Sequence, residues 1–183
     1  MNRYLSLFFI AATLLVLHGC ATAITKGADR RTEGAYIEDS TIEDTANTRI
    51  KNKYRDTVHI NVNSYNRKVL ITGEVPDEAT KSDMFRIAGT VQNVTDIHNE
   101  VIIGPHSSLA ARSNDALTTS NVYYRLRDSG KDFFRADRVK IITERNTVYL
   151  LGLVTHAEAA VATEIASTSS GVKKVVPFFE FID

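Results

Sequence analysis

Few side chains in this 183-residue chain could catalyse a reaction or bind a metal. Beyond the first 20 residues the histidines are His59, His98, His106 and His156. None has a second histidine or a carboxylate at a spacing typical of a metal or acid-base site, and no phosphate-binding glycine motif or Gly-x-Ser-x-Gly motif occurs. The acidic residues fall at expected helix starts or alternate with basic ones. We therefore expect no catalytic residue, no metal site, no small-molecule substrate and no enzyme activity.

The single cysteine, Cys20, has the setting of a lipid attachment site. Arg3 precedes an apolar run over residues 5–17, which is too short to span a bilayer as a helix and is typical of an export signal. The segment Leu-His-Gly-Cys that ends at Cys20 resembles a bacterial lipobox, although His18 departs from the usual small or apolar residue. The alternative is a plain secretory peptide with an incidental cysteine. A lone exported cysteine has no disulfide partner, which favours the lipidated form.

The expected mature protein begins at Cys20, after removal of residues 1–19 as a signal peptide. Diacylglycerol and an N-acyl chain on Cys20 would anchor it durably, because each buried methylene contributes about 0.8 kcal/mol. We expect no cofactor besides these covalent lipids. Ala21 differs from the aspartate that commonly retains lipoproteins in the inner membrane, so we expect the outer membrane. Residues 20–38 are polar and small and should form a flexible tether.

The charges balance, with 22 basic and 22 acidic residues. A formal net charge of zero argues against nucleic acid as a partner. Residues 125–140 are locally basic and include Arg125 and Arg127. Such a stretch could attract anionic lipid, at roughly 1 kcal/mol for each basic residue.

A helix expected next to this basic stretch carries two exposed apolar side chains. Leu117 and Tyr124 are seven residues apart and share one face, with Asn121 beside them. The pair could enter the head-group region of a membrane, or it could pack against the rest of the protein, and the sequence favours neither. The residues expected to face the core are Thr118, Val122 and Leu126. The candidate phospholipid-binding residues are Leu117, Asn121, Tyr124, Arg125 and Arg127.

These residues belong to the second copy of an internal repeat. Residues 69–97 and 148–175 each contain an apolar strand ending at a glycine, a short turn, a helix centred on Ile-Ala, and the start of another strand. A repeat of this length indicates duplicated small domains. Domains of roughly 65 to 70 residues are marginally stable alone, so we expect the two copies to pack together.

The order of elements in each copy is predicted as helix, strand, strand, helix, strand. Ser40 and Glu43 have the spacing of a capping box at the start of the first helix. His59 falls on the polar side of the alternating strand that follows, which we expect to face solvent. The helix between the last two strands is a crossover, so those strands should be parallel. The fold class is therefore α+β, with a three-stranded mixed sheet and two helices on one of its faces in each domain.

The αββαβ order, the glycine closing the second strand and Gly171-Val172-Lys173 before the last strand resemble the BON domain (bacterial OsmY and nodulation) family. The second copy carries most of the resemblance, through its segments Gly152-Leu153-Val154-Thr155 and Ile165-Ala166-Ser167. The resemblance gives a first BON domain at residues 39–103, a linker at 104–112 and a second BON domain at 113–183.

The resemblance also implies a function. It implies a non-enzymatic, lipid-anchored protein of the outer membrane that faces the periplasm and supports the integrity of that membrane. It further implies that anionic phospholipid binds to the first helix of the second domain. The alternative is a scaffold that binds a protein partner, such as the outer-membrane assembly machinery.

Overall fold

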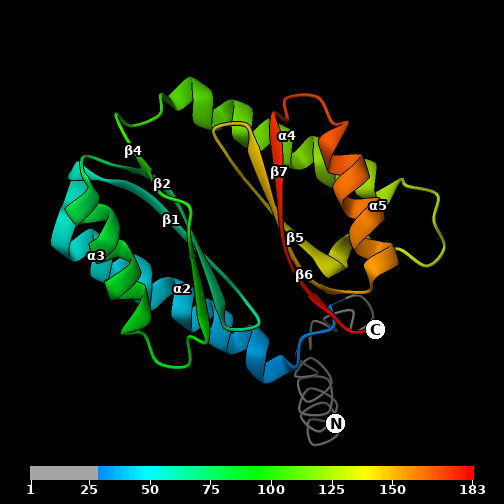
Figure 1. The fold of residues 1–183 in the computed structure, drawn as a ribbon, viewed down its shortest axis with the longest axis horizontal. Coiled ribbons are helices and arrows are strands. Elements are labelled where there is room, and N and C mark those ends of the chain that lie inside the picture. The colour runs from blue at the N-terminus through cyan, green and yellow to red at the C-terminus, as the bar shows by residue number, and fades with distance from the viewer. Residues whose placement is uncertain (1–28) are drawn as a thin grey trace, which may run out of the picture.

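The computed structural model describes residues 29–183, so Cys20, the signal peptide and much of the predicted tether lie outside the described residues. Both halves have the predicted αββαβ order, and the α+β fold class is confirmed (Figure 1). The first domain comprises α2 (Glu33–Tyr54), a 3₁₀ turn (Arg55–Thr57), β1 (His59–Tyr65), β2 (Lys68–Val75), α3 (Glu78–Gly89), β3 (Asp96–Asn99) and β4 (Ile102–Ile103). The second comprises α4 (Leu109–Arg127), a 3₁₀ turn (Ala136–Arg138), β5 (Val139–Glu144), β6 (Thr147–Val154), α5 (His156–Ser167) and β7 (Lys174–Phe181).

Both sheets are mixed, as predicted. In the second domain β5 and β6 pair antiparallel and β6 and β7 pair parallel. In the first, β1 and β2 are antiparallel, and β3 and β4 follow one another along β2 in parallel pairing. The single last strand expected here is interrupted at Glu100 and Val101, where the side chain of Val101 is buried and only 1% of the residue is exposed. Both strands advance three residues between the Ile71–Asn99 and Glu74–Ile102 pairs, so the register is kept across the interruption while Val101 joins the core of the first domain.

The first helix of each domain begins earlier than predicted. α2 starts at Glu33, and Thr32 caps it by accepting a hydrogen bond from the Ala35 backbone N–H at 3.1 Å. The prediction of a capping box at Ser40 is wrong, because the Ser40 hydroxyl lies within the helix and donates to the Tyr36 carbonyl. α4 likewise starts at Leu109, capped by Ser108, so the expected linker is partly helical. The buried side of α2 also extends toward its start, through Ala35 and Asp39, which keeps these earlier turns packed against the domain.

A buried aspartate in the first helix of each domain holds the hairpin between the first two strands. Asp39 accepts hydrogen bonds from the backbone N–H groups of Asn66 and Arg67, at 2.8 and 2.7 Å. Asp115 does the same for Arg145 and Asn146, at 2.8 and 2.9 Å. All four turn residues have positive φ, as the two-residue type I′ hairpin turn requires. The repeat therefore preserves a link between helix and turn that periodicity alone does not show.

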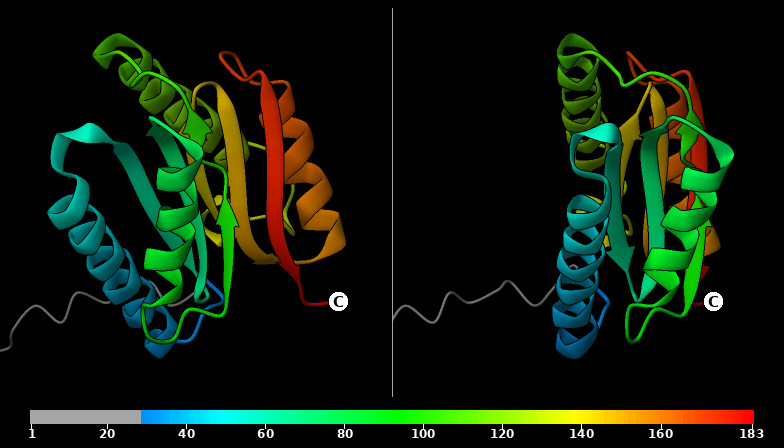
Figure 2. Two further views of the ribbon diagram at one scale, coloured as in Figure 1. Left: turned by 60° about the vertical axis from the view of Figure 1, so that its left-hand side comes forward. Right: turned by 90° about the vertical axis from the view of Figure 1, so that its left-hand side faces the viewer.

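The two sheets pack against each other, with the helices outside. α2 and α3 cover the outer face of the first sheet, and α4 and α5 cover the outer face of the second (Figures 1 and 2). The predicted packing of the two copies is thus confirmed. The centre of the interface contains buried Tyr65, Leu70, Tyr149 and Leu151. It is flanked by Ile142, Leu153, Val176 and Phe178.

The position of His59 shows that the prediction of a solvent-facing polar side for β1 is wrong. It lies on the sheet face that turns toward the second domain, and only 17% of its side chain is exposed. Its Nδ1 lies 3.0 Å from Oε2 of Glu74, which is fully buried. Alternation of polar and apolar residues identified two faces of the strand. It could not show that the polar face is covered by another domain.

Candidate functional site

The candidate surface is the outer side of α4. Four buried residues hold the helix on the second domain: Asp115, Thr118, Val122 and Leu126. The burial of the last three confirms the prediction, and the burial of Asp115 was not predicted. Because these residues recur every three or four positions, the side chains between them point outward. The candidate residues are therefore positioned by a packed helix rather than by a mobile loop.

Leu117 and Tyr124 remain in solvent. Leu117 is 68% exposed and Tyr124 is 53% exposed. The interface between the domains consists of sheet faces, and neither residue belongs to it. The structure thus favours an exposed apolar pair over a pair that packs against the first domain.

Two of the polar candidate residues fasten α4 to the end of α5. Asn121 Nδ2 donates to the Ser170 carbonyl at 3.3 Å. Arg125 Nη1 donates to the Ile165 carbonyl at 3.0 Å and to Ser169 Oγ at 2.7 Å. A guanidinium on the last carbonyls of a helix satisfies groups that lack partners within that helix and opposes the negative end of its dipole. Arg125 and Asn121 therefore hold the surface in shape, and part of their donor capacity is engaged within the protein.

Arg127 is arranged differently. Its guanidinium carbon lies 4.8 Å from the centre of the Tyr124 ring, and its Nε donates to Asp128 at 3.0 Å. The hydrogen bond and the charge of Asp128 raise the pKa of Arg127. A permanent positive charge thus sits beside the exposed aromatic ring. This cation–π pair presents an apolar surface and a cation at one place.

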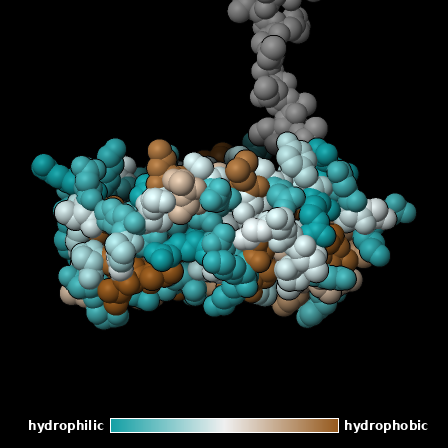
Figure 3. All heavy atoms as spheres, turned by 90° about the horizontal axis from the view of Figure 1, so that it is seen from above, coloured by the Kyte–Doolittle hydropathy of each residue, from teal (hydrophilic) through white to brown (hydrophobic). Residues whose placement is uncertain are grey.

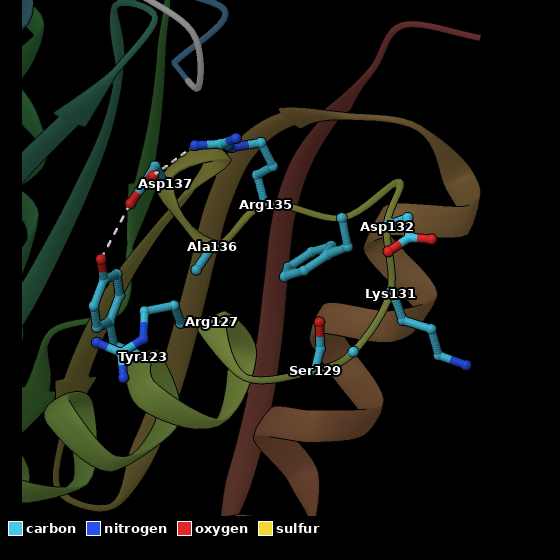
Figure 4. Close-up of a pocket in the computed structure, with 10 residues that line it drawn as sticks. Tyr123, Arg127, Ser129, Lys131, Asp132, Arg135, Ala136 and Asp137 are labelled. Atoms are coloured by element: carbon cyan, nitrogen blue, oxygen red, sulfur yellow. Dashed lines mark hydrogen bonds and ion pairs between the residues drawn. The ribbon is translucent and has the colours of Figure 1, made fainter. Parts of the chain in front are cut away.

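The loop after α4 forms a shallow hollow of about 500 Å³ next to Arg127 (Figure 4). Tyr123 donates from its hydroxyl to Asp137 at 3.1 Å on one side of it, and Lys131 extends outward from the loop on the other. Phe133, in the same loop, is 52% exposed. Seen from above, the molecular surface is mainly hydrophilic, and the hydrophobic side chains form small separate groups (Figure 3). The second domain therefore offers scattered apolar side chains among cations rather than a deep binding pocket.

The comparison with known families identifies the architecture. The BON domain profile matches residues 38–105 and again residues 114–182. The chain belongs to the BON domain family. Its two matches cover the two αββαβ units, so α4 is the first helix of the second BON domain.

Two curated relatives extend along most of the chain. The outer membrane lipoprotein DolP of Haemophilus influenzae is 33% identical over 180 residues, which cover 97% of this chain and 92% of DolP. The 21 kDa hemolysin of Actinobacillus pleuropneumoniae is 28% identical over 160 residues, covering 86% and 81% of the two chains. A solved structure of CdsD, a structural protein of the Chlamydia trachomatis type III secretion system, aligns with a TM-score of 0.30 at 14% identity and covers 80% of this BON protein and 92% of that chain.

The similarity to DolP confirms the predicted outer-membrane lipoprotein. Within residues 29–183, no helix is long and apolar enough to cross a membrane.

Sequence reasoning missed Phe133, an exposed apolar side chain in the loop that follows α4 of the second BON domain. Its neighbours Lys131 and Arg135 were recognised only as part of a basic stretch. The connection after the first helix is longer in the second BON domain than in the first. This extra length was the feature of the sequence that could have pointed to Phe133. An insertion in one copy of a repeat places extra side chains on one face of one domain.

The start of the described chain lies against the same BON domain. Arg30 donates to the Leu153 carbonyl at 3.0 Å and pairs with Glu158 at 2.5 Å. Asp29 and Arg31 line a hollow together with Asp137, the residue that accepts the Tyr123 hydroxyl. The chain therefore leaves the domain close to the C-terminal end of α4.

Proposed function

We propose that this chain is a non-enzymatic, periplasm-facing lipoprotein whose second BON domain binds anionic phospholipid through α4 and so supports the integrity of the outer membrane. The exposed pair Leu117 and Tyr124, with Arg127 against the Tyr124 ring, carries the proposal. Burial of each apolar side chain in the head-group region contributes roughly 1.5–3 kcal/mol. The cation attracts anionic lipid at roughly 1 kcal/mol.

The proposed anchor supports this geometry. Cys20 would carry diacylglycerol and an N-acyl chain, and these lipids would hold the protein at the membrane. A chain extends at most about 3.3–3.6 Å per residue, so residues 21–28 can separate Cys20 from Asp29 by no more than roughly 30 Å. Because Asp29 and Arg31 lie near Asp137, the tether keeps the C-terminal end of α4 within reach of the membrane.

Liposome binding by the protein without its anchor tests this function. Residues 21–183 should sediment with phosphatidylglycerol vesicles and not with phosphatidylcholine vesicles. Binding should weaken at high salt, because the Debye length falls from about 10 Å at 0.1 M to about 3 Å at 1 M. Equal binding to both vesicles, or to neither, would refute the proposed lipid recognition.

The second candidate is a scaffold for a protein partner, such as the outer-membrane assembly machinery. The first domain also exposes apolar side chains, since Phe85, Ile102 and Ile103 are 52%, 41% and 46% exposed. If α4 contacts lipid, these side chains of the first domain remain available to bind a protein partner. A protein that fails to bind vesicles but is cross-linked in cells through a photoreactive residue at position 85 or 103 would favour the scaffold.

A further inference from the structure

Three possible metal ligands meet where the two BON domains join. His59 begins β1, Glu74 lies near the end of β2, and Glu144 ends β5 of the other domain. One ligand atom from each lies within 4.8 Å of the others. Both carboxylates are buried, with Glu74 0% and Glu144 5% exposed. We propose that this junction binds a divalent transition-metal ion of the Zn²⁺ class, held by one imidazole nitrogen and two carboxylates.

The spacing suits such an ion. Zinc bound at about 2.0–2.2 Å in tetrahedral geometry places neighbouring ligand atoms roughly 3.3 Å apart. His59 Nδ1 and Glu74 Oε2 are already 3.0 Å apart. Rotation of the Glu144 side chain would bring its carboxylate to the third position. A mixed set of one nitrogen and two oxygens favours zinc over the harder cations Mg²⁺ and Ca²⁺, which take oxygen ligands.

The charges around the junction also favour a cation. The carboxylates of Glu74 and Glu144 come from different domains, and an oxygen of each lies within 4.8 Å of the other. Arg145 Nη1 lies 3.4 Å from Oε1 of Glu74, whereas Oε2 of that carboxylate lies 3.0 Å from His59 Nδ1 and accepts from Ser107 Oγ at 3.3 Å. One arginine balances only one of two ionised carboxylates. A divalent ion would compensate the remaining negative charge without displacing Arg145.

Two polar neighbours would complete the site. Asn61 is exposed and donates to Glu144 Oε2 at 2.9 Å, so it orients this carboxylate at a solvent-accessible edge through which an ion can enter. Thr72 precedes Glu74 by two positions on the same face of β2, and its Oγ1 is buried without a hydrogen-bond partner among the described residues. Buried hydroxyls are normally hydrogen-bonded. A water molecule in the fourth coordination position of the ion would place a polar group near the Thr72 hydroxyl.

The ligands were not detectable as a motif, because two domains contribute them. Glu144 follows Glu74 by 70 positions, and no short spacing joins them. Because the ligands come from both domains, a bound ion would cross-link the first domain to the second. Zinc should therefore stabilise the paired domains rather than either domain alone.

Metal binding by the full-length lipoprotein, purified in detergent with a histidine-free tag and stripped with EDTA, tests the proposal. Titration with Zn²⁺ should give one ion per chain and raise the melting temperature by several degrees. Co²⁺ should produce the strong visible absorption of a four-coordinate site. Glu144→Gln and His59→Gln should each weaken Zn²⁺ binding at least tenfold and abolish the absorption. Glutamine at 144 keeps an oxygen that can accept from Asn61, so this variant should fold as the wild type does in EDTA.

His156→Gln is the matched control. His156 Nδ1 also contacts a carboxylate, that of Asp183 at 2.8 Å, but the pair is exposed and residues 29–183 place no third ligand beside it. This variant should bind Zn²⁺ within twofold of the wild type. Absence of binding to the wild type at 100 µM Zn²⁺ would overturn the proposal. Unchanged binding by His59→Gln would also overturn it, and this second variant keeps the test decisive if Glu144→Gln fails to fold.

Discussion

The imidazole of His98 in the first domain stacks on the ring of Phe178 in the second, with ring centres 4.1 Å apart and an angle of 24° between the planes. Tyr149, on the neighbouring strand β6, has its ring centre 6.1 Å from that of Phe178, with the two planes nearly parallel. The aromatic stack sits at the apolar centre of the domain interface. It joins β3 to β7, two strands that are far apart in the sequence.

Phe178→Ala should therefore destabilise the whole protein rather than one domain. Truncation of a fully buried phenylalanine to alanine lowers the free energy of unfolding by about 3–5 kcal/mol. Because Phe178 is only partly buried, we expect a loss of about 2 kcal/mol. Urea unfolding followed by circular dichroism measures it. Phe85→Ala, at a phenylalanine that is 52% exposed, is the control and should change stability by less than about 0.5 kcal/mol.

The same interface predicts that the domains depend on one another. Residues 108–183 expressed alone should melt at a lower temperature than residues 21–183, because isolation exposes Tyr149 and Leu151. Equal melting temperatures would show that the interface adds no stability.

The lipid anchor gives an independent prediction. Cys20→Ser removes the thiol that would carry diacylglycerol, so the precursor should remain unprocessed or stay in the inner membrane. Sucrose-gradient separation of the two membranes, with labelled palmitate incorporation, measures both effects. Ala21→Asp is the companion variant and should keep a lipidated protein in the inner membrane. Normal outer-membrane fractionation of Cys20→Ser would contradict acylation at this site.

The repeat made much of the fold predictable. Helix periodicity identified the buried stripe of α4. The capping box of α5 joins Thr155 and Glu158, and their three-residue spacing is visible in the sequence. Asn93 and Gly171, which follow the second helix of each domain, both have positive φ, a conformation that asparagine and glycine tolerate. These features depend on residues close together in the sequence.

Features that depend on contacts between distant residues were missed. Asp39 and Asp115 are charged residues on helices, where sequence reasoning expects solvent, yet they are buried because hairpin turns supply backbone donors. His59 was misplaced for a similar reason, since the second domain covers the polar side of its strand. In the candidate lipid site, the exposed pair could be predicted from the helix wheel. The engagement of Arg125 by α5 could not, because it depends on how the two helices pack.

Acid should weaken the contact between Glu158 and its two arginines. Burial opposes ionisation of this carboxyl, but hydrogen bonds from Arg30, the Thr155 backbone and Arg138 lower its pKa to about 2 from an ordinary 4.5. A lowered pKa in the folded state adds stability above pH 4.5, and that stability is lost as the pH falls toward 2. The contribution is about 2 kcal/mol, allowing for solvent screening at the partly exposed Arg30.

Glu158→Gln tests this contribution. The wild type should be more stable than the variant at pH 7, and the difference in unfolding free energy should shrink as the pH is lowered from 5 to 2. Glu164→Gln changes an exposed glutamate of the same helix and should follow the wild type at each pH. A constant difference for Glu158→Gln across this range would show that the ionised form is not what stabilises the fold.

The last prediction concerns the outer face of α4. Leu117→Glu combined with Tyr124→Glu should abolish binding to phosphatidylglycerol liposomes, because apolar burial of roughly 1.5–3 kcal/mol per residue exceeds the screened attraction of the cation. The melting temperature should not fall, since both side chains are exposed. Leu109→Glu is the matched control, because Leu109 is 80% exposed on the same helix but about 80° around it from Leu117. Arg127→Glu should weaken binding at low salt only. If the double variant unfolds while its folded fraction still binds vesicles, the pair contributes to packing and the lipid must bind elsewhere.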